Sequence, residues 1–244
     1  MKRTFLLATC LISALLAAHA GNPVLISVGT DNTQMVFSAD SEGNLRTRHF
    51  GRRIGDTSPF LLMERSIHQE SGDGPMTVPT TGGRFLGTPA LHVRYADGSH
   101  NTELRYIGHE SMESLVGITT TEIRLKDPVT GLEVKLIYDA YPDVDVIVAR
   151  TAITNGGKKA VELLDYASSA MPVQSDKYLL THTWGGWASE MQVERELLGH
   201  DSKVIESRRG TQVTQSNNPS FMISLGTSEF SETAGDVIAG ALCW

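Results

Sequence analysis

Apolar and polar residues alternate with a period of two in many short segments of this 244-residue chain. This period is typical of β-strands with one buried face, whereas an amphipathic helix needs apolar positions three and four residues apart. Turn-forming residues separate the segments, for example at Asp97-Gly98 and in residues 127–131. The pattern predicts an all-β fold of antiparallel strands, and many strands of similar length favour a sandwich.

The predicted strands are residues 24–29, 34–38, 45–50, 90–95, 102–109, 115–126, 132–141, 146–155, 160–167, 178–183, 191–197, 203–206, 221–225 and 237–244. No internal repeat or domain linker is apparent. Alternation disappears between Gly51 and Gly87, where glycine and proline are dense. This segment is predicted to be a long loop, either the wall of a site or a partner contact, or alternatively a mobile surface excursion.

The N-terminus has the form of a secretory signal peptide. Two basic residues precede an apolar run over residues 5–18, and Ala18-His19-Ala20 matches the A-x-A cleavage pattern. We expect export to the periplasm or the medium after cleavage near Ala20, which leaves a domain over residues 21–244. A membrane anchor is disfavoured because the run is short and interrupted, and lipidation of Cys10 would leave too little apolar chain before it.

Charge and cysteine content exclude several functions. Removing residues 1–20 takes away two of 21 basic residues and none of 28 acidic ones, so the formal net charge changes from −7 to −9. An acidic surface disfavours nucleic acid. Only Cys243 would remain, which rules out an internal disulfide, a zinc knuckle and a cysteine nucleophile with its partners. The histidines are scattered singly, and no phosphate-binding glycine loop precedes a helix, so neither a metal nor a cofactor is expected.

Carboxylates offer weak candidates for acid and base catalysis. Asp143 and Asp145 lie in a proline turn, where a structural role is favoured. The other acidic candidates adjoin Trp187, and we interpret them as a structural network with nearby arginines. These residues are Glu190, Glu194 and Glu196, with Arg195, Arg208 and Arg209 as partners.

Aromatic recognition remains the best candidate chemistry. Trp184 and Trp187 flank a pair of glycines, and together with Tyr178 they could form a stacking wall for a pyranose ring. The alternative is that the tryptophans fill the core. We expect Trp184 to be in the core and Trp187 to lie in an exposed loop, while His182 merits attention because it precedes Trp184 by two residues.

Several ordered motifs resemble the N-terminal domain of glycoside hydrolase family 36, the bacterial α-galactosidases. They include residues 89–91, 141–142, 153–156, 186–188, 192–195, 206–211 and 218–221. The resemblance covers essentially all of residues 21–244. Two departures are Gly87-Thr88, where the family has an acidic residue, and Ser189, where an arginine is common.

The resemblance implies a galactose-mutarotase-like β-supersandwich that precedes a catalytic (β/α)₈ barrel. The family's two catalytic aspartates, which act by retention, belong to the barrel, so no catalytic residue is assigned here and the chain alone is predicted to be inactive. The tryptophan at the position of Trp187 reaches the active site in similar enzymes, and the sandwich helps to assemble the homo-oligomer. Expected ligands are α-galactoside sugars.

The last predicted strand, residues 237–244, is apolar to its final residue, so we expect a fragment whose sandwich is incomplete at the C-terminus. One alternative hypothesis is a free-standing carbohydrate-binding or assembly module. A second is a hydrolase that is active in this chain alone.

Overall fold

The computed structural model describes residues 22–63, 67–68, 72–73, 76–82, 85, 87–209, 216–226, 231 and 233–243. The predicted signal peptide lies outside them. The chain forms two compact units, residues 1–172 and 173–244. Residues 167–177, around this division, contain no strand, and the sequence pattern did not mark the division.

The first unit contains β1 (Val24–Gly29), β2 (Thr33–Ala39), β3 (Leu45–Arg52), η1 (Ser58–Leu61), β4 (Ile67–His68), β5 (Gly72–Asp73), β6 (Leu91–Tyr95), β7 (Arg105–Glu113), β8 (Thr119–Lys126), β9 (Leu132–Tyr141), η2 (Pro142–Val144), β10 (Val146–Asn155) and β11 (Val161–Tyr166). The second unit contains β12 (Tyr178–Gly186), β13 (Ser189–Leu197), β14 (Ser216–Leu225) and β15 (Asp236–Ala241). All of the named strand pairs are antiparallel.

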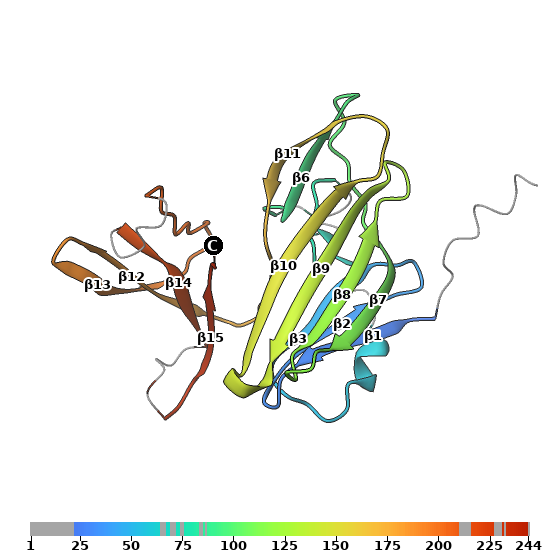
Figure 1. Cartoon of the computed structure of the whole chain (residues 1–244). Coiled ribbons are helices and arrows are strands. Elements are labelled where there is room, and N and C mark those ends of the chain that lie inside the picture. Colours follow the sequence, from blue (N-terminus) through green and yellow to red (C-terminus); the bar gives the residue numbers. More distant parts are fainter. Residues whose placement is uncertain are drawn as a thin grey trace, which may run out of the picture. The chain divides into compact units, whose positions relative to one another are not determined.

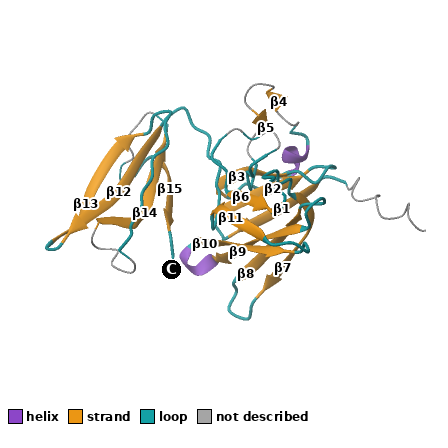
Figure 2. Ribbon diagram, turned by 90° about the horizontal axis from the view of Figure 1, so that it is seen from above, coloured by secondary structure: helices purple, strands orange, loops and turns teal. Residues whose placement is uncertain are grey.

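Two sheets form the layers of the first unit (Figures 1 and 2). One has the strand order β1-β2-β3 and the other β10-β9-β8-β7. In β9, Leu132, Val134 and Leu136 are buried, while Glu133 and Lys135 between them face outward. This is the period-two pattern that the sequence predicted, and it places one face of β9 in the core. The same core takes in apolar side chains of β1, β2 and β8, namely Ile26, Val28, Met35, Phe37, Ile123 and Leu125.

The segment predicted as a long loop contains more structure than expected. It includes η1 and the short pair β4–β5, and within it Thr77 and Val78 are buried. The amide of Thr77 donates to the carbonyl of Leu45, so the chain at this point lies beside the start of β3 instead of projecting into solvent. Parts of residues 51–87 lie outside the described residues.

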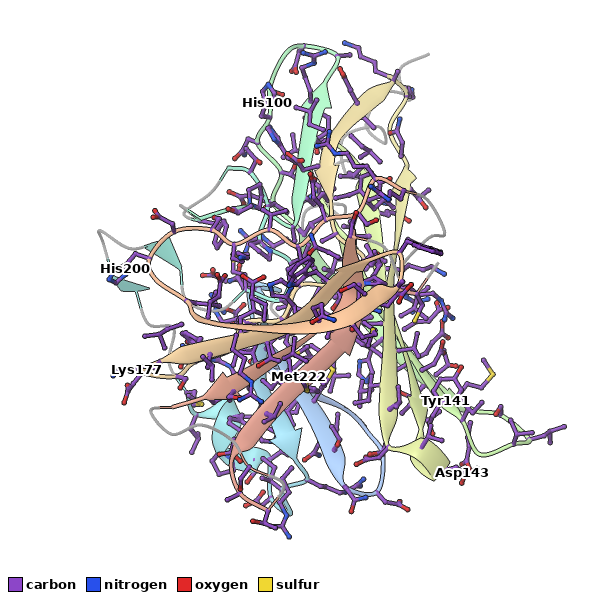
Figure 3. All side chains as sticks on the ribbon, turned by 90° about the vertical axis from the view of Figure 1, so that its left-hand side faces the viewer. His100, Tyr141, Asp143, Lys177, His200 and Met222 are labelled. Carbon is purple, nitrogen blue, oxygen red and sulfur yellow. The ribbon has the colours of Figure 1, made fainter. Side chains whose placement is uncertain are left out.

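The second unit is a four-stranded sheet with the order β13-β12-β14-β15. Leu180 and Ile238 are its buried apolar residues among those described, and Met222 of β14, labelled in Figure 3, is 37% exposed. The strand predicted at residues 203–206 is irregular in the structure. The last strand ends at Ala241, so the prediction that it continues to the final residue was wrong for residues 242–243.

Turn chemistry explains why β8 begins later than the sequence pattern predicted. The strand predicted from residue 115 begins at Thr119. Ser114 closes the preceding turn, because its amide donates to the Ile118 carbonyl and its hydroxyl accepts from the Ile118 amide. Gly117 supplies the positive φ of 77° that this turn needs.

The predicted fold class, an all-β antiparallel sandwich, is confirmed. Among the described residues, no helix has the length and apolar character needed to cross a membrane.

Candidate functional site

The β12–β13 hairpin carries the tryptophan motif. Gly186 pairs with Ser189, which leaves Trp187 and Ala188 as the turn between the strands. Ala188 adopts a left-handed φ of 59°, and the side chain of Trp187 is 86% exposed. The expected exposure of Trp187 is therefore confirmed, and its indole is available to a ligand.

Close packing across the hairpin explains one of the two glycines. A Cβ on Gly185 would lie 2.6 Å from the carbonyl oxygen of Ser189 and 2.7 Å from the Cα of Glu190. A Cβ on Gly186 would meet nothing within 4 Å. Gly185 therefore allows the two strands to approach each other, whereas Gly186 borders open space beside Trp187.

The three-residue aromatic wall is not assembled as predicted. Trp184 is 47% exposed, so its expected place in the core was wrong. Tyr178 lies at the other end of β12, about 20 Å from Trp184 along an extended strand. Its hydroxyl donates to the carbonyl of Val173 at 2.9 Å and accepts from the amide of Ser175 at 2.8 Å. Trp184 and Trp187 are thus the aromatic candidates.

Glutamates of β13 support the hairpin. Glu190 accepts a hydrogen bond from the amide of Ala188 at 3.1 Å and so braces the turn that holds Trp187. Glu196 pairs with Lys203 at 2.7 Å, a partner that the sequence interpretation did not name. This hydrogen bond from Lys203 to Glu196 raises the lysine pKa above its ordinary value. These contacts fit the expected structural role of the carboxylates but not the expected partners, since Arg208 pairs with Glu206 at 3.3 Å.

His182 lies within the hairpin, on its first strand β12. It is 5% exposed, and its Nε2 lies 3.8 Å from Oε2 of Glu194, the residue opposite it on β13. No group of three or more histidine, cysteine, aspartate or glutamate side chains gathers to hold a metal within the described ranges. Because it is buried, His182 contributes to the packing of the sheet that displays Trp184.

Sequence reasoning missed the part played by Met191. Its φ of 57° breaks the regular strand, and its sulfur accepts hydrogen bonds from Thr183 at 3.7 Å and from Asn218 at 3.6 Å. Asn217 in turn donates to the carbonyl of Glu206 at 3.0 Å. Three of the motifs that carry the family resemblance, around residues 192, 206 and 218, thus come together at one end of this sheet.

Two other candidates lie in the first unit. Asp143 belongs to η2, and Asp145 ends it with a left-handed φ of 54°. Asp145 accepts a hydrogen bond from the hydroxyl of Thr30, which lowers the aspartate pKa. This contact ties η2 to the chain between β1 and β2, so the favoured structural role of Asp145 is confirmed.

The fold has close counterparts among solved structures. A structure of α-galactosidase AgaA from Geobacillus stearothermophilus in complex with stachyose superposes with a TM-score of 0.79 at 24% identity, covering 88% of this chain and 33% of that one. A raffinose complex of AgaA gives a TM-score of 0.75, covering 83% and 32%. These similarities define the class of the chain as the β-sandwich found in such enzymes.

The family model described as the glycosyl hydrolase family 36 N-terminal domain matches residues 43–244, so the chain belongs to this family through that domain. It is 29% identical over 222 residues to α-galactosidase Mel36A of Lactobacillus acidophilus, covering 80% of this chain and 30% of the relative. It is 31% identical over 173 residues to AgaA, covering 65% and 23%. The chain thus spans a third or less of the length of these relatives.

Proposed function

We propose that this chain is the N-terminal part of an exported α-galactosidase that removes terminal α-galactosides with retention. In this proposal the sandwich supplies Trp187 as one wall of the sugar site and takes part in assembly of a homo-oligomer. One observation carries the proposal: the family match extends through a hairpin whose turn presents an 86% exposed Trp187. Raffinose and stachyose complexes of AgaA support the ligand class.

The physical basis is the shape of galactose. A pyranose has an apolar face of C–H groups that stacks on an aromatic ring, and its hydroxyls need polar partners nearby. Trp187 provides the flat surface, and Glu190 fixes the turn through the amide of Ala188. Rigid support matters because a fixed indole loses little entropy when the sugar binds.

Catalysis belongs to the remainder of the enzyme in this proposal. The resemblance puts both catalytic aspartates in a barrel, and the carboxylates of the hairpin are engaged in structural contacts. We therefore expect residues 21–244 to release no nitrophenol from a nitrophenyl α-galactoside. Turnover that Glu190→Gln abolishes would contradict this assignment.

A chimera tests the role of Trp187. The N-terminal region of AgaA that matches this chain would be replaced by residues 22–244, and raffinose hydrolysis would be measured. Trp187→Ala should raise KM about tenfold, because a lost stacking surface weakens binding by about 1.4 kcal/mol. Leu197→Ala, which truncates a 62% exposed side chain at the end of β13 away from the turn, is the matched control and should leave KM unchanged. Equal kinetics for the parent and Trp187→Ala chimeras would reject the role.

Calorimetry distinguishes the proposed enzyme fragment from a free-standing carbohydrate-binding module. We expect no measurable heat when raffinose is added to the chain alone, because one aromatic wall without the rest of the site binds weakly. Raffinose binding that Trp187→Ala removes would instead favour an independent carbohydrate-binding module.

A further inference from the structure

Two histidines that are separated in the sequence meet on the outer side of the β6–β11 sheet. Nε2 of His92 on β6 lies 2.9 Å from Nδ1 of His100, which follows the turn after β6. Their ring centroids are 5.0 Å apart. The sequence interpretation treated all histidines as isolated, and this pair corrects it. Figure 3 labels His100, which lies in the green segment beside β6.

The fold produces this meeting through local hydrogen bonding. The amide of Tyr95 donates to the carbonyl of Ser99 at 2.9 Å, so the chain reverses at Asp97-Gly98 and returns beside β6. Leu91 and Val93 are buried on the core side of β6, which leaves His92 on the opposite face. His92 is therefore positioned by β6, and His100 by the turn that follows β6.

A carboxylate stands behind the first histidine. Asp165 is opposite His92 in the β6–β11 register, and its Oδ2 lies 3.6 Å from Nδ1 of His92. At 3.6 Å this contact is too long for a hydrogen bond, but the nearby negative charge favours hydrogen on Nδ1 and the lone pair on Nε2. That lone pair faces His100. A carboxylate behind an imidazole whose other nitrogen carries the lone pair is the arrangement around many metal-binding histidines, and here that nitrogen is hydrogen-bonded to His100.

We propose that His92 and His100 form a binding site for a first-row transition-metal ion with tetragonal geometry, such as Cu²⁺ or Ni²⁺, with Asp165 as the outer carboxylate. At metal–nitrogen bonds of about 2.0–2.1 Å, cis ligands of a square-planar ion lie about 2.9 Å apart, whereas tetrahedral ligands lie about 3.4 Å apart. The observed 2.9 Å is the length of the hydrogen bond between the rings, and it equals the cis separation, so the two nitrogens already lie at the distance that a tetragonal ion requires.

Binding of a metal ion requires the two imidazole rings to turn and His100 to change its tautomer. In the hydrogen bond the ring nitrogens face each other, so the imidazoles turn to direct both lone pairs at one ion. His100 then carries its hydrogen on Nε2, and no net proton is released when both rings begin neutral. His92 is 26% exposed and Asp165 72%, which leaves access for the ion and for water as further ligands.

Copper titration tests the site independently of sugar binding. The full chain, with Cys10→Ser and Cys243→Ser to remove thiol ligands, would be titrated with Cu²⁺ at about pH 7.5, where histidine is neutral. Calorimetry should show one ion per chain, and electron paramagnetic resonance should show two equatorial imidazole nitrogens. His92→Gln or His100→Gln should weaken binding about tenfold or more, and Asp165→Asn about tenfold.

His109→Gln is the matched control. His109 Nδ1 shares a 2.7 Å hydrogen bond with the hydroxyl of Tyr106, away from the proposed pair, and this variant should bind copper like the parent. Circular dichroism would verify the sheet content of each variant. Equal copper affinity in the parent and the His92→Gln/His100→Gln double variant would identify an adventitious ion and overturn the proposal.

A second readout uses the unsubstituted histidines, so it does not depend on variants that fold. Ni²⁺ should protect His92 and His100 from diethyl pyrocarbonate, as measured by mass spectrometry, and leave the modification of His109 unchanged. Modification of His92 and His100 at an unchanged rate would also overturn the proposal.

Discussion

The ring of Phe37 on β2 lies 5.2 Å from the ring of Tyr138 on β9, centroid to centroid, with an angle of 33° between the planes. The two strands belong to different sheets, so this contact joins the layers of the first unit. Phe37 has no exposed surface and Tyr138 is 3% exposed. Burial disfavours the phenolate and raises the pKa of Tyr138 well above its usual range.

Truncation of Phe37 should destabilise the first unit strongly. Phe37→Ala removes a fully buried ring and leaves a cavity between the sheets, so the free energy of unfolding should fall by about 3–5 kcal/mol. Urea unfolding followed by circular dichroism measures the change. Tyr166→Ala is the control, because Tyr166 is 69% exposed on β11. A loss for Phe37→Ala no larger than that of the control would contradict the packing.

Asp139 should matter more than the other carboxylates on the outer face of its sheet. It is 6% exposed and accepts hydrogen bonds from Thr120 at 2.6 Å and from Arg150. Asp139→Ala should cost about 1–3 kcal/mol, because it leaves the Thr120 hydroxyl without its acceptor. Glu133→Ala should lower the free energy of unfolding by less than about 1 kcal/mol, because both side chains of the Glu133–Lys126 pair are about 40% exposed. Chemical denaturation measures the free energy of unfolding of both variants. Equal losses would contradict the larger role assigned to Asp139.

The turn after β2 should make stability depend on acid pH. Burial tends to raise the pKa of Asp40, but hydrogen bonds from Asn44 and Arg46 outweigh it and lower the pKa. A carboxyl group that binds its proton less tightly when folded contributes stability above its unfolded pKa of about 3.9. That contribution is lost as the pH falls through the folded pKa.

Asp40→Asn should therefore flatten the decrease in unfolding free energy below about pH 4. The measurement is a series of urea unfolding curves at decreasing pH. Ser41→Ala, an uncharged change in the same turn, should keep the parent slope. An unchanged slope in Asp40→Asn would show that Asp40 does not contribute to acid sensitivity.

The two glycines of the tryptophan hairpin should differ in their tolerance of alanine. A Cβ at Gly185 would contact backbone atoms of Ser189 and Glu190 at 2.6–2.7 Å, so Gly185→Ala must separate β12 from β13. We expect a loss of about 1–3 kcal/mol, as for other overpacked sites. Gly186→Ala meets open space and should be nearly neutral. Thermal unfolding followed by tryptophan fluorescence tests this, and similar transitions for both variants would contradict it.

Local patterns predicted much of the fold. The alternation in residues 132–141 and 146–155 matches β9 and β10, because one face of each strand must be apolar to be buried. The turn at Asp97-Gly98 was also predicted, and Gly98 adopts the positive φ of 84° that such a turn requires. Patterns failed for residues 203–206, where an alternation of a few residues predicted a strand that the structure does not contain.

The candidate site was predicted only in part. The sequence identified Trp187 and the hairpin glycines, whereas it misplaced Trp184 and grouped Tyr178 with them. Burial of a strand residue depends on which elements cover its face of the sheet, and that information is absent from the strand itself. The Glu196–Lys203 pair escaped notice for the same reason, since both residues are ordinary surface charges until the chain folds.

The sequence by itself determined most of the strand content, the family and the exposed position of Trp187, because alternation and motif order are properties of neighbouring positions. The tertiary structure alone decided which distant residues meet. Phe37 contacts Tyr138 because the two sheets pack together, and His92 contacts His100 because the turn at Asp97-Gly98 returns the chain beside β6. The Phe37–Tyr138 contact depends on sheet order and on which elements cover each face, and the pattern within a single strand does not contain that information.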